Sequence, residues 1–123
     1  MAKRILIVED SDDIALVVKT TLTMRQYEVA RACDGLEALE MARAGSWDLI
    51  ILDVIIPEID GFEVLRRLKS DPQTKAIKIA LFTANMTERE RQLSVDYGAD
   101  GVLVKPFDPR RFVEEIGVLV ADE

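Results

Sequence analysis

The chain of 123 residues contains no histidine, and this absence excludes more chemistry than any other feature of its composition. Without an imidazole there can be no Ser-His-Asp or Cys-His catalysis, no histidine-ligated metal and no histidine acting as a general base. The single cysteine, Cys33, excludes an internal disulfide and a multi-cysteine metal site. Any chemistry must therefore use carboxylates, hydroxyls, lysine or a hard cation.

The chain also lacks long apolar runs and an excess of positive charge. Its apolar runs are far shorter than the roughly 18–20 residues that cross a bilayer. The run at residues 5–8 is shorter than the roughly 7–15 apolar residues of a secretory signal. We therefore expect a cytoplasmic protein with no membrane association. The net charge of -7 argues against direct binding to nucleic acid.

What remains is the composition of an ordinary globular protein, with 49% apolar and 32% charged residues. We expect one domain that spans residues 1–123. Short apolar runs predict strands at residues 5–8, 27–32, 49–52, 79–82 and 102–104. The run at 27–32 alternates as a half-buried edge strand does, whereas the others are continuous, which is typical of strands covered on both faces.

Segments with helical spacing of apolar residues separate these runs, at residues 12–24, 34–45, 61–72, 87–100 and 108–120. In the first two, the predicted apolar stripes include Val17 and Leu36. The fourth segment is mostly polar, so we expect it to be the most mobile element. Strict alternation of strands and helices predicts an α/β fold, a doubly wound parallel sheet of five strands with helices on both faces.

Polar side chains follow four of the five predicted strands. Glu9 and Asp10 come after the first strand, Asp53 after the third, Thr83 after the fourth and Lys105 after the fifth. Taken singly, each has a common structural explanation as a helix cap, a turn residue or a surface lysine. Ligands of open parallel sheets bind beyond the carboxyl ends of the strands. The arrival of all these residues at that edge therefore indicates a functional site.

Three carboxylates at one edge imply a bound cation and a matching chemistry. Two unit charges about 4 Å apart repel by roughly 4 kcal/mol at an effective dielectric near 20. Such a cluster requires protonation or a hard divalent cation, and Mg²⁺ prefers oxygen ligands. With the cation beside Asp53, Lys105 and Thr83 would bind phosphoryl oxygens, and Asp53 would be the nucleophile that forms an acyl phosphate. The residues therefore predict a phosphoryl-transfer site.

The ordered set of these residues resembles the receiver domain of two-component response regulators. The resemblance covers essentially the whole chain and rests on Glu9-Asp10, Asp53, Thr83-Ala84 and Lys105-Pro106-Phe107. Pro57 and Gly61 also fit the loop pattern of the family. The resemblance implies a flavodoxin-like receiver fold with strand order 2-1-3-4-5.

The resemblance further implies that Asp53 accepts a phosphoryl group from a phosphohistidine of a partner. That partner would be a sensor histidine kinase or a histidine phosphotransfer protein, which is consistent with the absence of histidine from this chain. Mg²⁺ would be bound by Asp10 and Asp53, by Glu9 directly or through water, and by the backbone carbonyl of Ile55.

In the same family, a lysine contacts the phosphoryl group and a threonine transmits the signal. Here Lys105 would make that contact, and its bond to Pro106 is expected to be cis. Thr83 would move towards the phosphoryl oxygen and change the surface formed by the fourth helix, fifth strand and fifth helix, where a downstream protein binds. We expect a monomer or weak dimer that catalyses only its own phosphorylation and dephosphorylation.

We expect signal transmission and self-dephosphorylation to have features specific to this chain, because of Val102 and Ile55. Val102 stands where the family usually has tyrosine or phenylalanine, so the aromatic part of the usual coupling is missing. Our hypothesis is that rearrangement around Thr83 and Asn85 transmits the signal instead. Ile55 is a bulky apolar residue beside the expected path of water to the phosphoryl group, so we expect slow self-dephosphorylation.

Other protein classes with related folds or chemistry lack support in the sequence. A haloacid-type aspartyl-phosphate hydrolase would have a second acid two residues after its nucleophile, where this chain has Ile55. A flavodoxin-like electron carrier would have a hydroxyl-rich phosphate loop, but the acidic sequence EDSDD follows the first strand. A P-loop nucleotide switch would have GxxxxGK[ST], which is absent.

The remaining alternative is a pseudo-receiver that binds partners without being phosphorylated. Every expected site residue is present, which argues against it, whereas Val102 keeps it open. The sequence leaves open the cognate kinase, the downstream target, and whether the chain is a stand-alone receiver or a domain of a longer protein.

Overall fold

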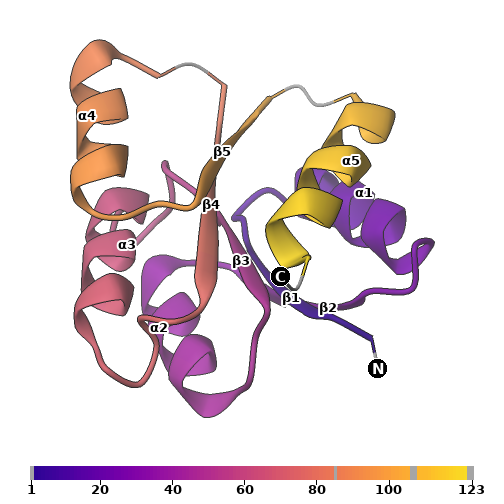
Figure 1. The fold of residues 1–123 in the computed structure, drawn as a ribbon, viewed down its shortest axis with the longest axis horizontal. Coiled ribbons are helices and arrows are strands. Elements are labelled where there is room, and N and C mark those ends of the chain that lie inside the picture. The colour runs from indigo at the N-terminus through magenta and orange to yellow at the C-terminus, as the bar shows by residue number, and fades with distance from the viewer. Residues whose placement is uncertain (1, 85, 106–107, 122–123) are drawn as a thin grey trace.

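The computed structural model describes residues 2–84, 86–105 and 108–121. Strands and helices alternate along the chain (Figure 1): β1 (Arg4–Val8), α1 (Asp12–Thr23), β2 (Glu28–Ala32), α2 (Gly35–Ala44), β3 (Leu49–Asp53), α3 (Gly61–Ser70), β4 (Lys78–Thr83), α4 (Glu88–Asp96), β5 (Gly101–Val104) and α5 (Pro109–Val120). All the predicted elements are present. The largest difference in bounds is at α4, which ends at Asp96 rather than at residue 100.

The strands form one parallel sheet in the order β2-β1-β3-β4-β5. Val8 of β1 pairs with Leu52 of β3, and Asp53 pairs with Phe82 of β4. Because all the strands run in the same direction, their carboxyl ends share one edge of the sheet. The doubly wound fold and the strand order implied by the resemblance are confirmed.

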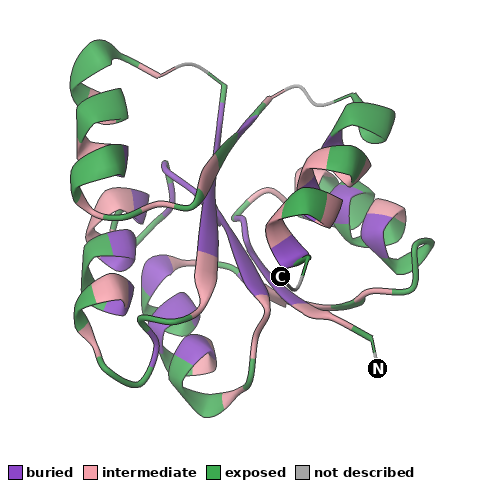
Figure 2. Ribbon diagram, in the orientation of Figure 1, coloured by how far each residue is buried: buried purple, intermediate pink, exposed green. Residues whose placement is uncertain are grey.

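The helices cover the sheet on two faces, and each face has its own core. Helices α1 and α5 lie on one side of the sheet and α2, α3 and α4 on the other (Figure 1). Every residue of β3 is buried, and its side chains alternate between the two cores (Figure 2). Leu49 and Ile51 pack beneath α1 and α5, whereas Ile50 and Leu52 pack beneath α2 and α3. The continuous apolar runs in the sequence follow from this two-sided burial.

In α1 and α2, two apolar residues of the predicted helical stripes are exposed. Val17 is 49% exposed, and Leu36 is exposed as well. On α1 the buried residues are Ala15, Val18 and Leu22, which lie along a narrower face than the one that we predicted. The sheet covers only this face of α1, so Val17 instead lines a cavity near the start of α5. The assignment of Val17 and Leu36 to buried stripes was therefore wrong.

None of the described helices combines the length and the apolar character that crossing a membrane would require.

Candidate functional site

The carboxyl edge of the sheet brings together the polar residues that the sequence singled out. Asp53 and Thr83 are the last residues of β3 and β4, while Glu9 follows β1 and Lys105 follows β5. Glu9 is 1% exposed and Asp53 is 4% exposed, and Thr83 is also buried. Burial of charged groups is unfavourable unless they are paired or bind a cation. This edge therefore has the electrostatics of a functional site.

Lys105 pairs with two of the buried carboxylates. Its Nζ lies 2.7 Å from Asp53 Oδ2, to which it donates a hydrogen bond, and 3.0 Å from Glu9 Oε1. The same ammonium lies 4.9 Å from the centre of the Phe82 ring. Burial lowers the pKa of Lys105, but the hydrogen bond to Asp53 and the ion pair with Glu9 outweigh it and raise the pKa above its usual value. One ammonium thus faces two carboxylates.

Glu9 is the carboxylate least well satisfied by the protein. Its Oε2 accepts a hydrogen bond from the Ser11 amide at 3.2 Å. Its Oε1 has only the ion pair with Lys105, which lacks hydrogen-bond geometry, and has no hydrogen-bond partner among the described residues. Burial raises the pKa of Glu9, and the nearby charge of Asp53 adds to this, although Lys105 and the Ser11 amide oppose it. A further positive charge would stabilise this side chain.

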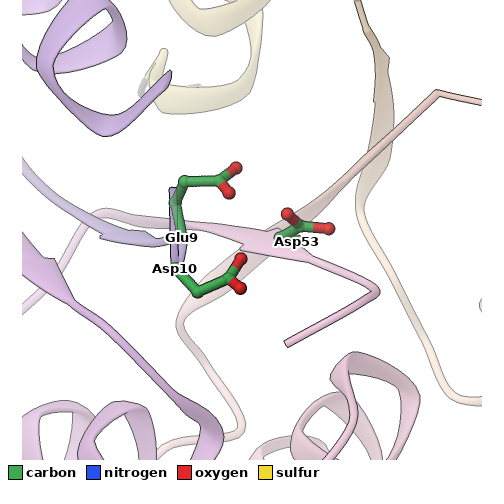
Figure 3. Close-up of side chains that lie close together, drawn as sticks. All are labelled: Glu9, Asp10 and Asp53. Atoms are coloured by element: carbon green, nitrogen blue, oxygen red, sulfur yellow. The ribbon is translucent and has the colours of Figure 1, made fainter. Parts of the chain in front are cut away.

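Asp10 completes an acidic cluster with Glu9 and Asp53. One carboxylate oxygen of each residue lies within 4.8 Å of the others. Figure 3 shows the three side chains together at the ends of β1 and β3. Asp10 is exposed, so the cluster opens to solvent. Hard carboxylate oxygens, one of them buried without a hydrogen bond, fit a divalent cation such as Mg²⁺.

The loop after β3 holds Asp53 in place. The Ile55 amide donates to Asp53 Oδ1 at 3.0 Å, and the Gly61 amide donates to the Val54 carbonyl at 3.0 Å. A Cβ on Gly61 would lie 2.5 Å from the Asp53 carbonyl oxygen, so only glycine allows this close approach. The Ile55 side chain is 81% exposed. The spacing of Gly61 from Asp53 in the sequence thus reflects a packing requirement.

Thr83 and Val102 line a common cavity. The cavity has a volume of about 230 Å³, and its other lining residues are Ala84, Met86, Arg91 and Val104. Val102 is partly exposed at the edge strand β5 and leaves this space open. The expectations for Asn85, for Phe107 and for a cis bond at Pro106 concern positions outside the described residues.

Arg31 is a residue of this edge that the sequence did not indicate. It lies in β2, and its guanidinium donates two hydrogen bonds to the Glu9 carbonyl and one to Asp12. The hydrogen bond to Asp12 raises the pKa of Arg31, although burial opposes it. Arg31 lies on the same face of this edge strand as Tyr27 and Val29, and an arginine in an edge strand gives no local signal of such a role. Only the pairing of β2 with β1 reveals it.

Comparison with known proteins identifies the family. The model of the response regulator receiver domain matches residues 5–117. The response regulator PleD of Caulobacter vibrioides is 42% identical over 108 residues, which are 88% of this chain and 24% of PleD. The chain therefore spans about a quarter of the length of that relative.

Solved structures of receiver domains show the same fold. The chemotaxis protein CheY4 of Vibrio cholerae matches with a TM-score of 0.91 and 34% identity, over 97% of this chain and 99% of CheY4. The receiver domain of the sensor histidine kinase PA1611 of Pseudomonas aeruginosa, with a magnesium ion coordinated in its active-site cleft, matches with a TM-score of 0.90 over 99% of this chain and 100% of that one. Its identity is 24%, so that likeness concerns the fold alone.

Proposed function

Because the chain belongs to the response regulator receiver family of two-component signalling, we propose that it is a phosphorylation-controlled switch whose phosphoryl acceptor is Asp53. The position of Asp53 is the observation that carries this proposal. It is a buried carboxylate at the sheet edge, with one oxygen on the Lys105 ammonium and the other on the Ile55 amide. Such an acid is oriented for attack, and its charge is partly neutralised.

The reaction transfers a phosphoryl group between two side chains. A carboxylate oxygen of Asp53 forms the new bond to phosphorus, and the bond from phosphorus to the imidazole nitrogen of the donor breaks. The electron pair of that bond stays with the imidazole. Lys105, which is already 2.7 Å from Asp53, would pair with a phosphoryl oxygen, and the Thr83 hydroxyl would donate to another. The imidazole belongs to a sensor histidine kinase or a histidine phosphotransfer protein, since this chain has no histidine.

The acidic cluster would hold Mg²⁺ during this reaction. The ligands would be Asp10, Asp53, the Ile55 carbonyl and Glu9, either directly or through water. The grouping of Glu9, Asp10 and Asp53 within 4.8 Å and the unsatisfied Glu9 Oε1 support this assignment. The cation supplies positive charge that offsets the repulsion between the carboxylates and the incoming phosphoryl group.

The signal would leave the site through Thr83 towards the surface of α4, β5 and α5, where a downstream protein binds. Val102 leaves a cavity beside Thr83, so the change would pass through the backbone around Thr83 and Asn85. The chain would act as a switch, and it would catalyse only its own phosphorylation and dephosphorylation. Chemical-shift changes on phosphorylation that end at the Asp53 pocket would contradict this route.

The test is incubation with acetyl phosphate and Mg²⁺, followed by intact-mass spectrometry. Wild type should gain one phosphoryl group, and Asp53→Asn should gain none. Glu40→Gln removes an exposed acid on α2, so it serves as a control that should behave as wild type. An adduct that persists in Asp53→Asn would contradict the assignment of the acceptor.

A pseudo-receiver is the second candidate, and Val102 is the residue that favours it. Such a protein would bind its partner without phosphorylation. The absence of any adduct on wild type would support this alternative. A pull-down that compares phosphorylated and unphosphorylated protein would then show whether partner binding depends on the phosphoryl group.

A further inference from the structure

Arg31 connects three elements of the chain at the acidic edge. Its Nε and Nη2 donate to the Glu9 carbonyl oxygen at 3.0 and 2.8 Å. Its Nη1 donates to Asp12 Oδ1 at 2.7 Å. The side chain thus extends from β2 to the end of β1 and to the first turn of α1. A planar guanidinium makes several such bonds in a fixed geometry, which an ammonium cannot do.

A contact to the Glu9 carbonyl affects two residues of the acidic cluster. It belongs to the peptide that joins Glu9 to Asp10, so fixing it restrains both residues. On the other side of the same residue, the Glu9 amide donates to the Ala32 carbonyl at 3.0 Å. Glu9 is therefore attached to β2 at both of its backbone polar groups. The acidic cluster depends on β2 for its geometry, although β2 itself contributes no carboxylate to it.

We propose that Arg31 is a positioning residue for divalent-cation binding, because it holds the peptide between Glu9 and Asp10. The inference rests on the proposed function, in which Glu9, Asp10 and Asp53 hold Mg²⁺. Groups that orient metal ligands commonly change metal affinity by about 10–100-fold when they are removed. Arg31 acts on the backbone of two of these residues, so we expect an effect near the lower end of that range.

The charge of Arg31 and its positioning role would have opposite effects on the affinity for Mg²⁺. A guanidinium near a cation site repels the cation, so removing it would strengthen binding if charge alone mattered. The Asp12 carboxylate, at 2.7 Å from Nη1, offsets part of this positive charge. We expect positioning to dominate, and the two effects predict opposite changes in affinity. This makes the sign of the change informative.

Arg31→Lys and Arg31→Met separate charge from geometry. Lysine keeps the charge but has a single nitrogen, so it cannot contact both the Glu9 carbonyl and Asp12 as the guanidinium does. Methionine removes both the charge and the donors. We expect the Kd for Mg²⁺ to rise about tenfold in Arg31→Met and by a smaller factor in Arg31→Lys.

The measurement is a titration with MgCl₂, followed by two-dimensional NMR of backbone amides in the intact chain. Signals of folded protein report the affinity of the folded state, so a loss of stability alone leaves the Kd unchanged. Arg4→Met is the matched control, because Arg4 also donates to a backbone carbonyl, that of Ser46, and lies at the opposite end of β1. The Kd of Arg4→Met for Mg²⁺ should stay within about twofold of wild type, because a distant charge is screened and has only a modest effect.

Each outcome decides between the inferences. A Kd in Arg31→Met equal to or below that of wild type overturns the role of Arg31. If that unchanged Kd is found while wild type binds Mg²⁺ and Asp53→Asn does not, the role of Arg31 alone is overturned and the proposed function stands. A wild type that binds no Mg²⁺ overturns both.

Discussion

Helices α3 and α4 cover the same face of the sheet but are attached to it in different ways. Helix α3 buries Gly61, Val64, Leu65 and Leu68. In α4, every residue of which the structure describes, Ser94 alone is buried and Val95 is 69% exposed. Local hydrogen bonds stabilise the start of α4, since Thr87 and Glu90 form a capping box. It is therefore a well-formed helix with little apolar burial.

This difference separates a fixed element from one that can be displaced. Helix α3 begins at Gly61, whose amide is bonded to Val54 directly after Asp53, so its position is tied to the candidate site. Helix α4 follows β4 and Thr83, and few buried contacts oppose its displacement. Elements that move in signalling come from the parts of a protein with low local stability. The comparison thus predicts that α4 responds to the site while α3 supports it.

The largest expected difference concerns the core contacts of the two helices. Leu65→Ala on α3 should lower the free energy of unfolding by about 2–5 kcal/mol, because it leaves a cavity in the core. Leu93→Ala on α4 should lower it by about 1 kcal/mol or less, because Leu93 is only partly buried. Urea unfolding of both variants measures this. Equal losses in the free energy of unfolding would contradict the proposed difference between α3 and α4.

The next effect concerns the glycines that flank the two helices. Gly61→Ala should cost about 1–3 kcal/mol, because its Cβ would lie 2.5 Å from the Asp53 carbonyl oxygen and 2.6 Å from Val54 Cα. The displaced backbone carries Asp53, so acyl phosphate formation should slow as well.

Gly98→Ala, just after α4, is the matched control for this substitution. The positive φ of 84° makes alanine unfavourable there by about 1–2 kcal/mol, but the added Cβ meets only Lys69 Cγ, at 3.8 Å. We therefore expect a loss of stability with an unchanged rate of phosphorylation. Equal phosphorylation rates in the two variants would show that α3 is not tied to the site.

A smaller effect is expected from the exposed apolar residue between β3 and α3. Ile55→Ala should shorten the lifetime of the phosphorylated form a few-fold, which corresponds to about 1 kcal/mol in the barrier, because water reaches the acyl phosphate more easily. Val95→Ala removes a similarly exposed apolar side chain from α4 and should leave the lifetime unchanged. Release of phosphate, measured with and without Mg²⁺, gives both lifetimes. A longer lifetime in Ile55→Ala would contradict the role of this side chain.

Much of the fold could be predicted because its signals are local in the sequence. Continuous apolar runs mark strands that are covered on both faces, and alternation with helical segments leaves few topologies. The order of the strands came from the resemblance, not from periodicity. The errors at Val17 and Leu36 arose because periodicity gives a broad apolar stripe, whereas the width of the buried face depends on the neighbouring elements.

The site could be predicted where its residues follow strands, and not where they act across strands. Glu9, Asp53 and Lys105 end or follow strands of a parallel sheet, so their approach follows from the topology. Their grouping is confirmed, while their roles stay predictions. Arg31 acts on the Glu9 carbonyl across the pairing of β2 with β1. A hydrogen bond to a backbone carbonyl does not require a particular residue type at the accepting position, so the sequence could not indicate this contact.

The smallest expected effect concerns surface charge on the two helices. Arg66 and Arg67 donate hydrogen bonds to Glu63 of α3 and lower its pKa from 4.5 to about 2. Folding therefore favours the ionised form of Glu63, and the associated stability is present above about pH 4.5 and is lost as the pH falls towards 2. Glu63→Gln should flatten the fall in stability over this range of pH. Because the group is exposed, the effect should weaken further in high salt.

Glu88→Gln on α4 provides the comparison, since Glu88 Oε2 lies 4.0 Å from Arg91 Nε and both side chains are largely exposed. Thermal unfolding of wild type and both variants between about pH 2 and 5 should show a change in slope for Glu63→Gln alone. A similar change in Glu88→Gln would mean that the ion pairs of the two helices are equivalent. The difference between α3 and α4 would then rest on their apolar contacts only, and α4 would still be the helix that is less costly to displace.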